Sequence, residues 1–399
     1  MQETDKKKPL AIVIGRNYTT RLTLARSAGM IGCDVVLIQT DGHKNSTLKI
    51  DRSSQFVVDS HFCPEPYKNQ LIDVILSYKN VRPKVLLVPA DDYAASVIDS
   101  HLEMLSESFL LPHVNYQQGG VLRIMDKAYQ KSLALSVGFH VAKGWIATYS
   151  SNEYTIPEGV TYPCFTKPLE SYDGALKNYL KKCSSEKELK ELLAIISKSY
   201  HLPILIEEFV KIDREYGVQG VSFATKSVCP SVVFKESSLR GLTATGYISP
   251  ISKMPGLQKK IQDFMKETCF TGIFDIDLFE SDGQIYFNEL NVRLGANGFA
   301  LTYGVFNVPG IFMEYQLGRN NGEYNGPEEF ASMSFASEKV LREMYYDKII
   351  SFKDYKRIRK DADVLSLKYQ DDNHPYQEFV KLDVVLPLWS LLRDINKKN

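Results

Sequence analysis

A stretch of alternating polar and apolar residues in the last third of the chain carries the clearest chemical signal. Glu289, Asn291 and Arg293 are two residues apart, and the positions between them are apolar. Side chains two apart in a β-strand point to the same face, so these three should share one face above a buried layer. Asp277 precedes them on another β-type run, and Ser281-Asp-Gly283 lies between as a turn. We therefore predict a β-hairpin that places Asp277 within cross-strand reach of Glu289.

This hairpin face has the residue types of a metal and phosphate site. Two carboxylates and one carboxamide, from Asp277, Glu289 and Asn291, make an all-oxygen donor set that suits a hard cation such as Mg²⁺. The guanidinium of Arg293 would meet negative charge that builds up on a phosphoryl or tetrahedral centre. The simpler alternative is an exposed hairpin whose polar face is merely solvated.

Three features upstream strengthen the chemical interpretation. Lys127 begins a helix in Met-Asp-Lys-Ala, Lys167 ends a strand in Thr-Lys-Pro, and a strand ends in Ile206-Glu-Glu-Phe-Val210. Each is common alone, because a single lysine is normally a surface residue. In this order and spacing, together with the hairpin, they resemble the ATP-grasp superfamily over about residues 121–318. The likeness is greatest to carboxylate–amine ligases of the D-aspartate ligase type, related to the large chain of carbamoyl-phosphate synthase.

The resemblance implies a nucleotide site. Lys127 and Lys167 would contact the phosphates of ATP, and Lys167 would also take part in catalysis. The adenine and ribose would be bound at and after one strand end, by Glu207, Glu208, Phe209, Val210 and Glu215. Within that set, the carboxylate of Glu207 accepts from the adenine amino group, and Glu215 stands at the ribose position. The backbone of Glu208 and Val210 completes adenine recognition.

The resemblance also implies a metal and catalytic set. Asp277, Glu289 and Asn291 would bind Mg²⁺, with Glu289 bridging two ions and Mn²⁺ able to substitute. Arg293 would stabilise the transferred phosphoryl group and tetrahedral intermediates. The hairpin spacing of twelve residues (289 − 277) is typical of the family.

Two departures from the family pattern stand out. The loop after Lys167 usually carries several glycines that fold over the phosphates, but here it has only Gly174. Phosphate clamping would then involve Ser171. Asp277 is found where glutamate is commoner, and its side chain is one methylene shorter.

The elements that would position these residues follow from the hydrophobic pattern. Short apolar runs at 10–15, 34–38 and 84–88 alternate with helical stretches at 19–30 and 65–78. This alternation predicts a doubly wound parallel sheet, an α/β domain. The strand-rich region after it predicts an α+β domain, which the resemblance interprets as the two-subdomain ATP-grasp fold. The expected division is a preceding domain 1–118, an ATP-grasp domain 119–318 with subdomains of about 119–206 and 207–318, and a mostly helical extension 319–399.

Further substrate contacts are predicted at strand ends and in one basic segment. Ligands of a doubly wound sheet bind at the carboxyl ends of its strands, which puts Arg16 and the pair Asp91-Asp92 near a small molecule. Arg16 and the helix N-terminus behind it could hold a substrate carboxylate, although a structural turn is the default. Lys235 and Arg240 could contact substrate, or they could belong to a solvated loop.

Composition excludes several classes of protein. Lys plus Arg and Asp plus Glu are both 48, so the chain lacks the basic excess of proteins that hold long nucleic acids. Six cysteines without a C-x-x-C pair fit free thiols in a reducing cytoplasm. The apolar run at 10–15 is too short for a signal peptide or a membrane span. We expect a cytoplasmic protein, and a homodimer is compatible with the sequence.

The predicted activity is an ATP-dependent ligation. A carboxylate would be activated as an acyl phosphate and joined to an amine, with release of ADP and phosphate. By resemblance, an amino acid and a peptide or cell-envelope precursor are the expected small-molecule partners. Two alternatives stay open: a bicarbonate-activating carboxylase or carbamoyl-phosphate-type enzyme, and a non-catalytic nucleotide-binding regulator.

Overall fold

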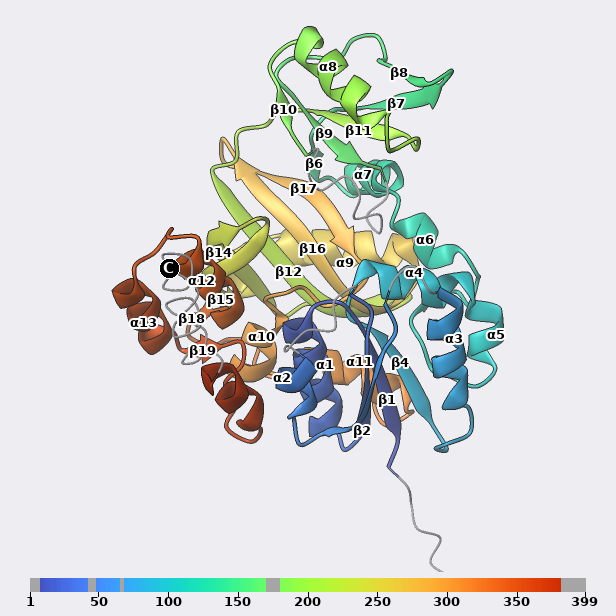
Figure 1. Cartoon of the computed structure of the whole chain (residues 1–399), viewed down its shortest axis with the longest axis vertical. Helices are drawn as coiled ribbons and strands as arrows, with labels where there is room; N and C mark the ends of the chain where they lie inside the picture. Colours follow the sequence, from blue (N-terminus) through green and yellow to red (C-terminus); the bar gives the residue numbers. More distant parts are fainter. Residues whose placement is uncertain (1–7, 42–47, 65–67, 170–179, 382–399) are drawn as a thin grey trace, which may run out of the picture.

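The computed structural model describes residues 8–41, 48–64, 68–169 and 180–381. Within these residues the strands form an N-terminal parallel sheet, a small antiparallel sheet and a large mixed sheet (Figure 1). The fold class expected from the sequence, an α/β domain followed by an ATP-grasp-like α+β region and a helical C-terminal segment, is confirmed.

The N-terminal sheet is parallel, with the strand order β3-β2-β1-β4. Its elements are β1 (Leu10–Gly15), α1 (Tyr18–Met30), β2 (Asp34–Gln39), α2 (Leu48–Arg52), β3 (Val57–Phe62), α3 (Lys68–Ser77), β4 (Val85–Pro89), α4 (Asp92–Ser100) and α5 (Leu102–Ser106). The central strands are buried on both faces, which explains their continuous apolar runs. α3, α4 and α5 cover one face of this sheet, and α1 covers the opposite face. The side chain of Asn17 caps α1 by accepting from the Thr19 N–H at 3.2 Å.

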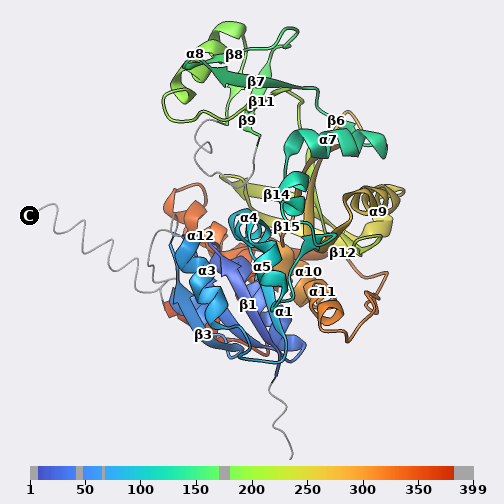
Figure 2. The ribbon, with the colours of Figure 1, turned by 90° about the vertical axis from the view of Figure 1, so that its right-hand side faces the viewer.

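The small sheet has the order β10-β9-β11-β7-β8 and carries one helix. Its elements are β7 (Gly144–Ser150), β8 (Glu153–Thr155), β9 (Cys164–Pro168), β10 (Lys182–Cys183), α8 (Glu186–Ile196) and β11 (Ile204–Glu208). Apolar residues at helical spacing on α8, Leu189, Leu193 and Ile196, pack on Ile204 and Ile206 of β11. We call this small sheet with α8 the small unit. Figure 2 shows it standing apart from the rest of the molecule, above the large sheet.

The large sheet runs β19-β18-β15-β14-β12-β16-β17-β6, with β13 and β5 as side branches. Its strands are β5 (His113–Val114), β6 (His140–Val141), β12 (Arg214–Phe223), β13 (Lys226–Val228), β14 (Ser231–Leu239), β15 (Leu242–Pro250), β16 (Phe270–Ser281), β17 (Gln284–Asn291), β18 (Met333–Ala336) and β19 (Val364–Leu365). Asp282 and Gly283 join β16 to β17 with φ of 48° and 72°. Positive φ at both central residues matches the right-handed twist of a tight hairpin, so this turn fixes the register of the two strands.

Helices cover both faces of the large sheet. One face carries α6 (Gly120–Ile124), α7 (Lys127–Ser136) and α9 (Leu257–Thr268), and the other carries α10 (Gly298–Gly304) and α11 (Val308–Gln316). Residues of α11 and of β12 share one core with β1, β2 and β4. The N-terminal sheet is therefore packed firmly against the large sheet.

The C-terminal segment returns to the N-terminal domain. It contains α12 (Glu338–Tyr346) and α13 (Phe352–Asp361), and its strand β18 pairs with β15. Arg26 of α1 and Asp372 form an ion pair at 2.8 Å with both side chains fully buried. All six cysteines are free thiols, as expected. Among the described residues, no helix combines the length and apolarity needed to cross a membrane.

Candidate active site

The β16–β17 hairpin gathers oxygen donors on one face. Asp277 lies opposite Glu289 in the register, and Asp275 lies opposite Asn291. The side-chain amide of Asn291 donates to Asp277 Oδ2 at 3.3 Å. The structure therefore brings together the three side chains that the sequence proposes as metal ligands, and it adds Asp275 to them.

A β-bulge next to this cluster points one more polar group toward the small sheet. The register shifts between Asp277 and Leu278, which pair with Glu289 and Phe287, so Asn288 is the extra residue. The amide oxygen of Asn288 accepts from Lys167 Nζ at 2.8 Å. The bulge thus links the hairpin of the large sheet to the lysine at the end of β9.

Two lysines, one buried and one partly buried, flank the buried Glu207 at the end of β11. Lys167 Nζ lies 2.6 Å from Glu207 Oε2, and Lys131 of α7 is paired with the other carboxylate oxygen. Burial alone would raise the pKa of Glu207, but the two ammonium groups outweigh burial and lower that pKa. Glu207 is therefore an ionised acceptor held between two cations.

α7 is fixed so that Lys127 reaches the hairpin. Asp126 caps the helix by accepting from the Tyr129 N–H at 2.7 Å. The side chain of Gln130 donates to the Leu290 carbonyl and accepts from its N–H, both at 2.9 Å. This clamp places Lys127 Nζ 3.6 Å from Glu289 Oε1 and 3.2 Å from the Pro168 carbonyl. Lys127 therefore lies between the metal-ligand candidates and the end of β9.

The segment proposed for adenine binding follows the end of β11. The Glu208 N–H donates to the Lys143 carbonyl and the Phe209 N–H donates to the Pro163 carbonyl, both at 2.9 Å. The Glu208 side chain also accepts from the Lys143 N–H at 2.7 Å. The Phe209 ring is 40% exposed, and its centroid lies 4.0 Å from Lys182 Nζ. The backbone of this segment is therefore anchored on both sides, while the ring stays open to solvent.

The same edge continues toward the residue proposed for ribose binding. Val210 is half-buried, and Glu215 is exposed on β12, opposite Lys235 in the register. The adenine and ribose candidates therefore lie along the segment that connects β11 of the small sheet to β12 of the large sheet.

Arg293 is held by acceptors on three sides. Its Nη2 donates to Asn291 Oδ1 at 3.0 Å, its Nη1 lies 3.4 Å from Asp275 Oδ2, and its Nε lies 3.5 Å from Asp92 Oδ1. Burial alone would lower the pKa of Arg293, but Asp92 and Asp275 outweigh burial and raise it. Burial, reinforced by the nearby Asp277, raises the pKa of Asp275 to about 7. Arg293 is thus a permanent cation inside an acidic cluster.

The four residues proposed for substrate contact have different surroundings. Lys235 is paired with Asp277, directly at the metal-ligand candidates. Arg16 donates its backbone N–H to Asp91 Oδ2 at 2.6 Å, and its Nε lies 3.4 Å from the same oxygen. Arg240 lies at the exposed β14–β15 turn and is paired with Asp347 at 2.7 Å. Ser171 lies outside the described residues.

The hairpin cluster has the chemistry of a Mg²⁺ site. Its donors are oxygens on one hairpin face, and ammonium groups of Lys127 and Lys235 lie against the carboxylates of Glu289 and Asp277. Within the described part of the chain, no group of three or more His, Cys, Asp or Glu side chains has a metal-binding arrangement. The donor set nevertheless fits Mg²⁺, because that ion binds few protein oxygens and keeps waters and phosphate oxygens as its other ligands. The lysines supply the positive charge that the carboxylates require.

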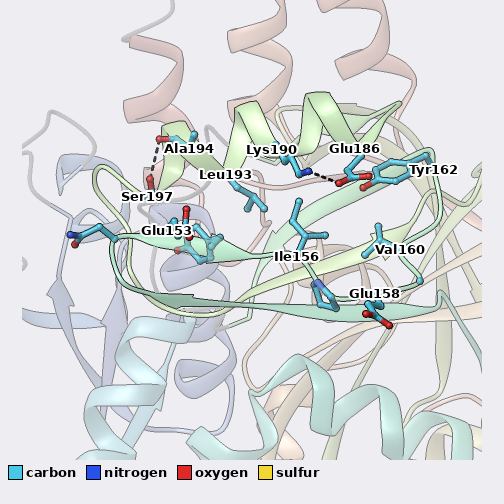
Figure 3. Close-up of a pocket in the computed structure, with 14 residues that line it drawn as sticks. Glu153, Ile156, Glu158, Val160, Tyr162, Glu186, Lys190, Leu193, Ala194 and Ser197 are labelled. Atoms are coloured by element: carbon cyan, nitrogen blue, oxygen red, sulfur yellow. Dashed lines mark hydrogen bonds and ion pairs between the residues drawn. The ribbon is translucent and has the colours of Figure 1, made fainter.

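A separate cavity of about 670 Å³ lies on the small unit, away from these residues (Figure 3). Its lining includes Ile156, Val160 and Leu193, and Lys190 pairs with Glu186 at its edge at 2.6 Å. None of the residues that the sequence proposes for the site lines this cavity. The candidate active site is therefore the lysine- and carboxylate-lined junction of the sheets.

Four polar residues of this junction were not predicted as site residues. Lys131 lies one helical turn after Lys127, and Asp275 lies two residues before Asp277 on the same strand face, so spacing could have indicated both. The sequence predicts only that Asp92 lies near a small molecule at a strand end. Its contact with Arg293 joins two domains, and no local pattern indicates it. Asn288 is turned toward Lys167 by a bulge that no sequence signal marks.

Comparison with known proteins agrees with this geometry. Residues 133–302 match the model of the ATP-grasp domain. A curated relative is the formate-dependent phosphoribosylglycinamide formyltransferase of Bacteroides fragilis, which is 24% identical over 187 residues. That match covers 46% of this chain and 48% of the relative, so it spans about half the length of each.

Solved structures share the fold across most of the chain. The L-amino acid ligase of Bacillus licheniformis has a TM-score of 0.60 and 15% identity, covering 83% of this chain and 80% of that one. The biotin carboxylase domain of the Hydrogenobacter thermophilus 2-oxoglutarate carboxylase, solved with MgADP, ADP and bicarbonate, has a TM-score of 0.61 and 13% identity. It covers 81% of this chain and 73% of that one. At these identities the likeness establishes the fold.

Proposed function

We propose that the protein is an ATP-dependent carboxylate–amine ligase. It would activate a carboxylate as an acyl phosphate, join it to an amine and release ADP and phosphate. The observation that carries this proposal is that one hairpin places Asp277 opposite Glu289 and also meets three cations. Lys127 lies against Glu289, Lys167 donates to Asn288, and Arg293 donates to Asn291. The ATP-grasp match over residues 133–302 supports the same class of chemistry.

ATP would lie along the edge between the small and large sheets. Glu207 would accept from the adenine amino group, with the backbone of Glu208 and Val210 and the ring of Phe209 completing the adenine pocket. Glu215 would bind the ribose. Lys127 and Lys167 would contact the phosphates, and for this Lys167 has to exchange part of its contact with Glu207 for a phosphate oxygen. A nucleotide in this position would replace intramolecular ion pairs with charge-assisted contacts of similar strength.

Asp277, Glu289 and Asn291 would hold Mg²⁺, as one ion or two. The bound metal supplies positive charge to the β- and γ-phosphates and leaves the transferred group more electrophilic. Mn²⁺ has similar oxygen chemistry and is expected to substitute.

The chain's own residues would then direct the transfer. Arg293 and Lys167 would stabilise the charge spread over the phosphoryl oxygens, because both are cations held in place by carboxylates and amides. Lys235 would exchange Asp277 for a substrate oxygen. Approach of the small unit toward the large sheet would exclude water, which would otherwise hydrolyse an acyl phosphate.

The substrate pair is proposed as an amino acid and a small amine-bearing acceptor, such as a peptide or cell-envelope precursor. The structural likeness to an L-amino acid ligase supports an amino-acid substrate. A bicarbonate-activating reaction is the second candidate, because an equally similar fold was solved with MgADP and bicarbonate.

One assay separates the two candidates. ADP release is measured with D- and L-amino acids paired with amine acceptors, and separately with bicarbonate, always with MgATP. The ligase proposal expects ADP release that needs an amino acid and an amine together and that yields an amide detectable by mass spectrometry. ADP release that depends on bicarbonate alone would favour the carboxylase instead, and ATP binding without turnover in any mixture would favour a nucleotide-binding regulator.

A further inference from the structure

The N-terminal domain contributes one carboxylate to the catalytic hairpin. Asp92 is the first residue of α4, and its Oδ1 lies 3.5 Å from Arg293 Nε. Both side chains are largely buried, with exposed fractions of 16% and 20%. The pair therefore joins two domains at the point where the proposed chemistry takes place.

Each edge of the Arg293 guanidinium meets a different acceptor. Asp275 and Asn291, which lie on the hairpin itself, contact Nη1 and Nη2 at 3.4 and 3.0 Å. Asp92 contacts Nε, the remaining edge, from the N-terminal domain. Nη1 also donates to the Leu294 carbonyl at 3.3 Å. A planar guanidinium with acceptors on all edges has one orientation, whereas loss of the Nε contact would leave acceptors only at Nη1 and Nη2 and allow the group to tilt about them.

Asp92 is itself held in a fixed position. Asp91, directly before it, caps α4 by accepting from the Ala94 N–H at 2.9 Å, and it also accepts from the Arg16 N–H at 2.6 Å. The Ala90 N–H donates to the Ile14 carbonyl of β1 at 2.7 Å. The start of α4 is therefore tied to the carboxyl end of β1, and Asp92 is presented to Arg293 from a rigid support.

We propose that Asp92 is a positioning residue for phosphoryl transfer, which orients the Arg293 guanidinium from the N-terminal domain. The inference rests on the proposed function, because it assigns Arg293 to the phosphoryl group. The N-terminal domain would then contribute to catalysis by orienting the hairpin arginine, in addition to the substrate contacts proposed for its strand ends. A small misorientation of a group that contacts the transition state can cost about 100-fold in rate.

The proposal differs from a purely structural ion pair in what it predicts for ground-state binding. Asp92→Ala removes the acceptor, and Asp92→Asn keeps its shape and a neutral acceptor. We expect the affinity for MgATP to change by less than about 3-fold, because ground-state binding uses the lysines and the hairpin carboxylates. Affinity for MgADP with aluminium fluoride, a mimic of the transferred phosphoryl group, should fall by about 10- to 100-fold for alanine and less for asparagine.

Asp99→Asn is the matched control. Asp99 is a buried carboxylate on the same helix, and it accepts from the Val121 and Leu122 N–H groups at 3.2 and 2.9 Å without contacting Arg293. We expect it to lower the melting temperature and to leave analogue affinity unchanged. Arg293→Lys supplies the second test: if Asp92 acts through Arg293, Asp92→Ala should cost less than about 3-fold in that background.

Calorimetry with MgATP and with MgADP plus aluminium fluoride decides the outcome. Weaker analogue binding by Asp92→Ala, unchanged MgATP binding and loss of the effect beside Arg293→Lys support the proposal. Three results would overturn this inference and leave the proposed function standing. They are wild-type analogue affinity in Asp92→Ala, an equal loss of analogue affinity in Asp99→Asn, and an undiminished effect of Asp92→Ala in the Arg293→Lys background. A wild-type protein that binds neither MgATP nor the analogue overturns both the proposed function and this inference.

Discussion

Removing the charge of Glu207 should unbalance the most buried ion cluster of the candidate site. Glu207→Gln leaves two ammonium groups without a carboxylate between them. The exposed fractions of Glu207, Lys131 and Lys167 side chains are 6%, 10% and 21%, so water compensates only the last of them well. Leaving an uncompensated charge in such a site costs about 3–5 kcal/mol. Because Lys167 can turn toward solvent, we expect the lower end of that range, about 3 kcal/mol.

The assay is thermal unfolding at pH 7.5. Hydrogen exchange of β9 and β11 then reports on the small unit separately. For a chain of 399 residues the unfolding entropy is about 0.8 kcal/mol/K, so a loss of about 3 kcal/mol should lower the melting temperature by about 3–4 °C. Glu208→Gln is the control, because its side chain accepts one hydrogen bond from the Lys143 N–H, which glutamine can also accept. It should unfold close to the wild type.

The pH dependence follows from the direction of the Glu207 shift. Its pKa is lowered in the folded protein, so its contribution is present above the ordinary pKa of about 4.3 and is lost as pH falls through the folded value. The difference between wild type and Glu207→Gln should therefore shrink in acid. Equal melting temperatures of the two proteins at pH 7.5 would refute the view that these ion pairs stabilise the site.

Two further predictions concern other positions. A Cβ at Gly295 would lie 2.6 Å from Asp275 Oδ2, so Gly295→Ala should displace that carboxylate. We expect the free energy of unfolding to fall by about 1–3 kcal/mol and kcat to fall as well. A wild-type melting temperature and turnover rate would contradict this prediction. Burial lowers the pKa of His113 to about 4, so the folded protein keeps it neutral while the unfolded chain binds a proton below about 6.5. Between pH 7.5 and pH 5, the free energy of unfolding in urea should fall by about 2 kcal/mol more for the wild type than for His113→Gln. Equal decreases in the two proteins would contradict a neutral, buried His113.

Much of the fold could be predicted because its signals are local. The apolar runs of β1, β2 and β4 and the Asp282-Gly283 turn specify buried strands and a hairpin without reference to distant residues. β15 gave a weaker signal, because its first half is rich in Gly and Thr and half-buried. Its place in the large sheet depends on pairing with β14 and β18, which the local sequence does not encode.

The candidate site could be anticipated where one element presents several groups. Glu289, Asn291 and Arg293 share a strand, so period-two spacing was enough to group them. The contacts of Asp92 with Arg293 and of Lys131 with Glu207 join elements far apart in sequence, and they depend on how domains and helices pack. Asn288 reaches Lys167 only because one residue of β17 is unpaired at a bulge.

The hairpin carboxylates are proposed to hold a divalent ion that binds the phosphates of ATP. The most direct measurement is the calorimetric affinity for ATP with Mg²⁺ and with EDTA, for the wild type and for Glu289→Gln. The wild type should bind ATP about 10- to 100-fold more tightly with Mg²⁺, in line with the cost of disturbing a metal site, and Glu289→Gln should lose most of that difference. An equal Mg²⁺ dependence in both proteins would contradict the claim.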